Sequence, residues 1–209
     1  MKNTVAIMGE DGRDPSIGAI LGLTGSGPDW ARVQGQQYAV LSQKRWVRFA
    51  LHALGALCLG LVFYGSAGPV SIAVWGLVVL AIAFHSVWID HSLMHCDIKG
   101  LQRADFVHHS VNALLKGLAW AAPALLFAPG ADTATNATAW SFVALLGLAA
   151  ATSRFSAPLS SVLFSASFSL GWAVGLVMAG DFYLAAIAAF TGLFAAAASV
   201  ESARVPGGA

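Results

Sequence analysis

Six long apolar stretches restrict what this sequence can fold into. A helix needs about 20 mostly apolar residues to cross a lipid bilayer, and all six stretches reach or approach that length, although the fourth is short. Charged residues make up only 10% of the chain, whereas soluble domains carry about 25%. The sequence therefore predicts an all-α polytopic membrane protein with six transmembrane helices in a bundle. The stretches cover residues 46–65, 69–89, 111–130, 137–153, 158–180 and 182–200.

Turn-forming pairs separate the apolar stretches. We expect turns at Gly68-Pro69, Pro129-Gly130, Ala157-Pro158 and Gly180-Asp181. The triplet Asn136-Ala137-Thr138 fits a glycosylation acceptor pattern, but we interpret it as an external loop. Gly171 and Gly175 form a G-x-x-x-G pair, which favours close helix packing, more often within a chain than between two copies.

The distribution of positive charge predicts the orientation. Lys and Arg concentrate on the cytoplasmic side of membrane helices. With a cytosolic N-terminus, all 11 Lys and Arg residues fall in cytosolic segments or within about two helical turns of them. The predicted external loops carry only Asp132 and Asp181. We therefore expect six spans with both termini in the cytosol.

The same reading divides the chain into parts. Residues 1–30 are rich in Gly, Asp, Ser and Pro and are predicted to form a disordered cytosolic segment. Residues 31–205 form the six-span bundle, with a cytosolic histidine-rich loop at 90–110, and residues 206–209 form a short tail. The lipid bilayer is the expected partner, and a net charge of +1 gives no basis for nucleic-acid binding.

Residues 91–109, HSLMHCDIKGLQRADFVHH, hold four of the six histidines. Imidazole binds divalent transition metals, so His91, His95, His108 and His109 are candidate ligands for iron, copper or haem. The spacing of His91 and His95 also occurs in membrane di-iron hydroxylases, which need three histidine boxes that this chain does not supply. A hydrated polar loop at the membrane boundary is the more ordinary interpretation. We expect no cofactor and keep a metal- or haem-binding membrane protein as an alternative.

Two further histidines, His52 and His85, lie inside apolar stretches. An ionisable residue at membrane depth suggests a function by default, although a neutral histidine bonded to a neighbouring helix is more common. They are therefore candidates for sensing a signal. A small transporter subunit is a third hypothesis, disfavoured because no span contains an embedded acid or a matched pair of interrupted helices.

Four segments carry a resemblance to a known family. They are KGLAWAAPALLF (116–127), AAATSRFSAPLSSVLFSASFSLG (149–171), GDFYLAAIAAFTGLFAAAA (180–198) and SVESAR (199–204). Over residues 31–204 the chain resembles the N-terminal membrane-embedded sensory region of bacterial GGDEF/EAL cyclic-di-GMP signalling proteins, the diguanylate cyclases and phosphodiesterases. Trp120 and Arg154 stand in these segments and join the signal-sensing candidates.

The resemblance implies a sensory input module in a bacterial inner membrane. Such a module couples a membrane or ligand cue to a cytosolic output domain or partner protein, for example one that controls cyclic-di-GMP turnover. Outputs of this kind work in pairs, so a homodimer is compatible with the resemblance. The family's catalytic residues lie in GGDEF and EAL domains, which this sequence does not contain, so we expect no catalytic activity in the chain itself.

Overall fold

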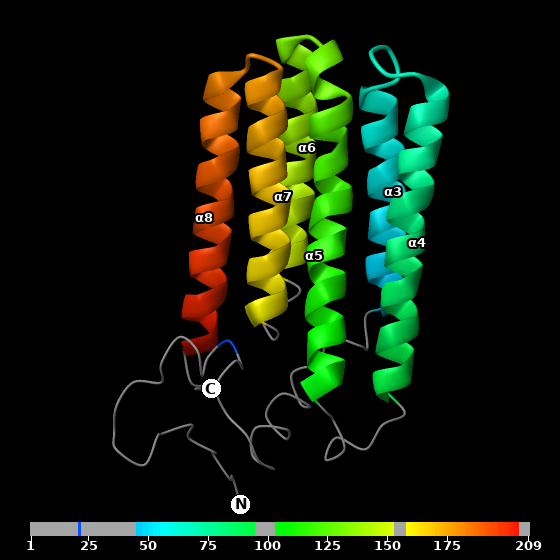
Figure 1. The fold of residues 1–209 in the computed structure, drawn as a ribbon, viewed down its shortest axis with the longest axis vertical. Helices are drawn as coiled ribbons and strands as arrows, with labels where there is room; N and C mark the ends of the chain where they lie inside the picture. Colours follow the sequence, from blue (N-terminus) through cyan, green and yellow to red (C-terminus); the bar gives the residue numbers. More distant parts are fainter. Residues whose placement is uncertain (1–20, 22–44, 95–102, 153–157, 205–209) are drawn as a thin grey trace, which may run out of the picture.

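The computed structural model describes residues 21, 45–94, 103–152 and 158–204. In this part of the chain the fold is all-α, with six long helices that run alternately up and down (Figure 1). They are α3 (Arg45–Val62), α4 (Pro69–Met94), α5 (Arg103–Leu126), α6 (Thr133–Thr152), α7 (Pro158–Met178) and α8 (Phe182–Arg204), with a short 3-10 helix, η2, at Ala128–Gly130. The segment 1–30, the tail 206–209, His95 and Arg154 lie outside the described residues.

Five helices in the described part of the chain are long and apolar enough to cross a membrane. Their outward faces carry large exposed apolar side chains such as Leu61, Leu77 and Phe190, which lipid chains cover favourably. The chain is therefore a multi-pass helical membrane protein in contact with the bilayer. The five segments are Arg45–Val62, Pro69–Ser92, Ala104–Gly130, Leu159–Met178 and Phe182–Glu201.

The sixth helix, α6, begins with polar residues. It starts four residues before the predicted stretch, so Asn136 lies in a helix instead of an external loop. The Asn136 side chain is fully buried, and its Nδ2 donates to the Asp181 carboxylate at 2.7 Å and to the Ala128 carbonyl at 3.2 Å. These bonds satisfy the Nδ2 donors of the amide, whereas its buried Oδ1 accepts no hydrogen bond from the described residues. Burial leaves no room for a glycan at this position.

The predicted turns coincide with helix boundaries. Pro69 and Pro158 are the first residues of α4 and α7, a position where the missing N–H of proline costs nothing. Gly180 ends the turn after α7 with φ of +82°, and Asp181 N–H returns to the Leu176 carbonyl at 2.8 Å. At the start of α6, the Thr135 backbone N–H donates to Asp132 at 2.7 Å, and this bond lowers the pKa of the Asp132 carboxyl.

Helices α4 and α5 extend into the predicted histidine-rich loop. Helix α4 continues to Met94 and α5 already begins at Arg103, about two turns before the predicted stretch at 111–130. The third span therefore runs from Ala104 to Gly130, and Lys116 lies near its middle, about 18 Å from Ala104 at 1.5 Å per residue. Lys116 is thus deeper in its span than the predicted orientation expects, since that orientation keeps every Lys and Arg within about two helical turns of the cytosol.

Small residues let α7 lie directly against α5. A Cβ added at Gly171 would lie 2.3 Å from the Ala121 Cβ, and one at Gly175 would lie 2.2 Å from the Ala124 carbonyl oxygen. The G-x-x-x-G pair is thus used within the chain, as predicted. Helix α7 also packs along α8, while α3 and α4 form a hairpin to one side of α5 (Figure 1).

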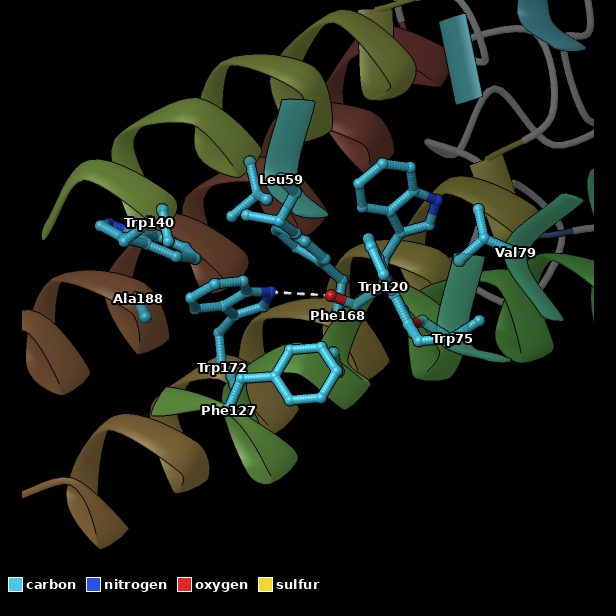
Figure 2. Close-up of a cluster of buried hydrophobic side chains, with 14 of the residues drawn as sticks. Leu59, Trp75, Val79, Trp120, Phe127, Trp140, Phe168, Trp172 and Ala188 are labelled. Carbon is cyan, nitrogen blue, oxygen red and sulfur yellow. Dashed lines mark hydrogen bonds between the residues drawn. The ribbon is translucent and has the colours of Figure 1, made fainter. Parts of the chain in front are cut away.

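An aromatic core fills the bundle where these helices meet (Figure 2). Trp140 stacks on Phe168, and Trp75 meets Trp120 edge-on at 5.9 Å between ring centroids. Trp172 is fully buried, and its indole N–H donates to the Trp120 carbonyl at 2.9 Å, the dashed line in Figure 2. Buried indoles need such partners, so the core is both apolar and specifically hydrogen-bonded.

Candidate functional site

A chain of polar side chains joins four helices near one end of the bundle. Arg48 on α3 pairs with Asp90 on α4. His109 on α5 lies with Nε2 3.6 Å from the other Asp90 oxygen, and its Nδ1 is 3.2 Å from the Ser160 hydroxyl on α7. We refer to Arg48, Asp90, His109 and Ser160 as the Asp90 chain.

The up-and-down order of the helices brings these four residues together. Arg48 lies in the first turn of α3, Asp90 near the end of α4, His109 about two turns into α5, and Ser160 in the first turn of α7. All four positions belong to the same end of the bundle, where α8 also ends (Figure 1). The site is therefore assembled by tertiary structure from positions far apart in the sequence.

The Asp90 chain is buried. The exposed fraction of Asp90 is 2% and that of His109 is 6%. Lys116, with 7% exposed, adds another positive charge within electrostatic range of Asp90. A buried charge needs its partner, and removing one member of such a pair costs about 3–5 kcal/mol. An intact pair adds little net stability, so its presence points to structural specificity or function.

One helical turn deeper, a second polar connection joins α4 and α5. Asn112 donates through Nδ2 to the Ser86 hydroxyl, and its Oδ1 lies 3.4 Å from Nδ1 of His85. Asn112 and Ser86 are buried, whereas His85 lies on the outer surface and stacks on the exposed Trp88. The amide of Asn112 thus connects a lipid-facing imidazole to the interior.

A third connection surrounds the proline of α5. Pro123 has no N–H, so the Ala119 carbonyl loses its usual donor within the helix. The indole N–H of Trp75, from α4, donates to this carbonyl at 2.8 Å. Trp172, from α7, donates to the adjacent Trp120 carbonyl. Tryptophans from two neighbouring helices therefore satisfy the backbone next to the proline, as a membrane interior requires.

Two of the predicted sensing residues meet in this region. The Trp120 indole N–H donates to His52 Nδ1 at 3.0 Å, and the two rings lie 5.8 Å apart. His85 is on the far side of α4, next to Trp88, and Arg154 lies outside the described residues. The structure thus joins His52 and Trp120 and separates them from His85.

The predicted metal ligands are dispersed where the structure describes them. His91 and His108 are exposed, whereas His109 is buried against Asp90. No group of three or more potential metal-binding side chains occurs among the described residues. Because His95 lies outside them, the four-histidine site for iron, copper or haem stays a prediction.

Sequence reasoning missed Asp90, Arg48 and Asn112. The sequence places Asp90 at the start of the predicted loop at 90–110, where a charge is cheap. In the structure Asp90 lies near the end of α4 and within the candidate span Pro69–Ser92, but its side chain is buried and pairs with Arg48. One sequence signal could have found the pair: Arg48 and Asp90 carry opposite charges on either side of the Gly68-Pro69 turn, at similar distances from it.

Comparisons with models of protein families, with curated proteins and with solved structures find no match to this chain.

Proposed function

We propose that this chain is a membrane-embedded sensory input module that couples a membrane or ligand cue to a cytosolic output, such as cyclic-di-GMP turnover. The observation that carries the proposal is the buried Asp90 chain, which joins α3, α4, α5 and α7 at the end of the bundle where α8 leaves it. Ionisable residues inside a membrane are expensive and are usually kept for function.

The proposal includes six spans with this end of the bundle in the cytosol of a bacterial inner membrane. Arg45, Arg48, Arg103 and Arg204 stand at this end of their helices, whereas the opposite end carries Asp132 and Asp181. Helix α6 counts as the sixth span because it packs beside α3, α7 and α8 and the Nδ2 of its buried Asn136 donates to partners within the protein.

The Asp90 chain gives the module a means of changing state. The α3–α4 hairpin meets α5 through polar contacts: the Arg48–Asp90 pair, the Asp90–His109 contact and the Asn112 bridge. Charged contacts inside a bundle are directional, so a shift of the hairpin exchanges one set of partners for another. Helix α7 shares the chain through Ser160 and packs along α8, so such a shift reaches the cytosolic end of α8. A signal that binds one of the two arrangements more tightly increases the population of that arrangement.

A reporter fusion tests the proposal. A diguanylate cyclase domain is joined after Arg204, and cyclic-di-GMP production is measured in membranes. We expect Asp90→Asn and Arg48→Gln to change the output at equal protein levels, because each breaks the buried pair. The matched control is Asp132→Asn, which removes the same charge from an exposed position at the other end. Output that is identical in all variants, and identical when an unrelated membrane anchor replaces the bundle, would contradict a sensing role.

A further inference from the structure

His85 is a polar side chain on the lipid-facing surface of the bundle. It lies on the exposed side of α4, about 10 Å from Ser92 at the end of that span. Histidines at such depth usually face the interior of a bundle or a partner. Trp88, 63% exposed, stacks on the imidazole with ring centroids 5.9 Å apart and 30° between the planes. Together the two rings form a polar patch on the outer surface of α4.

The hydrogen bonds behind the patch set the tautomer of His85. Asn112 uses its Nδ2 to donate to Ser86, which leaves its Oδ1 to face His85 Nδ1 at 3.4 Å. Because Oδ1 only accepts, Nδ1 must carry the proton of this bond. In the neutral ring the remaining nitrogen, Nε2, is then an acceptor. The patch therefore offers an acceptor to molecules dissolved in the membrane.

Trp88 supplies the complementary donor. Its backbone carbonyl accepts from Ser92 at 3.1 Å, but its indole N–H donates to no residue in the part of the chain that the structure describes. The acceptor of His85 and the donor of Trp88 stand three residues apart on one helix face, about one turn. A hydroxyl group can donate to the first and accept from the second, and the aromatic ring that carries it can pack against the edge of the indole.

We propose that His85 and Trp88 form a binding site for the aromatic head group of a membrane-dissolved quinol. The O–H of the quinol donates to His85 Nε2, and its oxygen accepts from the Trp88 indole. The oxidised quinone has no O–H, so it leaves Nε2 without a partner and binds less tightly. The site thus distinguishes the reduced from the oxidised form. This inference identifies the quinol as the cue of the proposed sensor. The signalling role of the site rests on the proposed function, whereas quinol binding does not.

Equilibrium dialysis tests the site directly. The full chain in lipid nanodiscs is titrated, without oxygen, with a decyl-tailed benzoquinol and with the corresponding benzoquinone. We expect the quinol to bind about tenfold more tightly, the value of one well-placed hydrogen bond. His85→Leu should abolish this preference, while His108→Leu, an equally exposed histidine on α5, should keep it.

A second variant distinguishes an effect of the His85 tautomer from the simple loss of a side chain. Asn112→Ala removes the acceptor behind His85, so the imidazole can adopt either tautomer and Nε2 can be a donor as well as an acceptor. We expect quinone affinity to rise toward that of the quinol, which a purely structural defect would not produce. Equal binding of both forms by the unmodified chain, or a preference that survives His85→Leu, would overturn the proposal. So would a change of oligomeric state in His85→Leu, which would assign the patch to a second copy.

The two proposals fail separately. If the quinol does not bind but the reporter fusion still responds to Asp90→Asn, only the quinol site is wrong. If the quinol binds with the expected preference but leaves the output of the fusion unchanged, the site stands and the sensory role is wrong.

Discussion

Asp90 shows how strongly a single residue depends on its surroundings in a membrane bundle. A carboxylate at the end of a helix keeps its water, but this one is enclosed by Arg48 and His109. Its neighbour His91 points outward from the same helix. One residue along a helix is a rotation of about 100°, enough to move a side chain from the interior to the surface.

Removing the Asp90 carboxylate should destabilise the bundle. We expect Asp90→Ala to lower the free energy of unfolding by about 3 kcal/mol, because the Arg48 guanidinium loses its carboxylate partner in a largely buried site. Removing both charges, in Asp90→Ala with Arg48→Leu, should recover part of this loss. Denaturant unfolding in detergent micelles provides the measurement. A double variant no more stable than Asp90→Ala would show that the pair is not coupled.

At the scale of the element, α5 combines a proline with tryptophans from its neighbours. The helix tolerates Pro123 because the Trp75 indole replaces the missing backbone donor to Ala119. Its other face packs closely against Gly171 and Gly175 of α7. The element is therefore held by contacts on two sides, and each contact can be tested by one substitution.

The Trp75 bond should depend on the proline. Trp75→Phe keeps the aromatic packing and removes the donor, so we expect a loss of about 1–2 kcal/mol in unfolding free energy. In a Pro123→Ala background the helix supplies its own N–H, and the same change should cost markedly less. Trp88→Phe, at an exposed indole, is the control and should be close to neutral. Equal costs in both backgrounds would contradict the proposed role of the indole.

The α5–α7 contact should not admit an added methyl group. Gly175→Ala places a Cβ against the Ala124 backbone, so we expect a clear loss of thermal stability. Gly76→Ala is the matched control, because a Cβ there meets nothing within 4 Å. The control should be neutral or slightly stabilising, since alanine favours a helix over glycine by about 1 kcal/mol. Thermal shift measurements on both variants check the difference, and equal effects would count against tight packing.

At the scale of the whole molecule, the number of spans decides on which side each end lies. Six spans place the start of α3 and the end of α8 on one side, while omission of α6 would separate them. The polar first turns of α6 are paired with Ala128 and Asp181 inside the protein, which favours a full crossing. The proposed orientation rests on the arginines at one end of the bundle and the aspartates at the other.

Topology reporters should confirm this arrangement. We expect a reporter after Arg204 to be active in the cytosol and one inserted at Asp132 to be active outside. The reason is that the positive charges of α3, α5 and α8 stand at one end of the bundle. Fusions of alkaline phosphatase and of a fluorescent protein at both positions provide the measurement. Phosphatase activity after Arg204 would contradict the proposed cytosolic end of α8, and the same reporter result at both positions would contradict three crossings between them.

The sequence by itself determined the apolar helices, their approximate limits and most of their turns, because these depend on local composition and on residues such as Pro69, Pro158 and Gly180. It also indicated that Gly171 and Gly175 pack closely. Only the tertiary structure decided which polar residues meet. Asp90 pairs with Arg48, Trp120 bonds His52, and His85 faces outward. These contacts follow from the rotation of each helix about its axis and from the helix that packs beside it, and the local hydrophobic pattern encodes neither the rotation nor the neighbour.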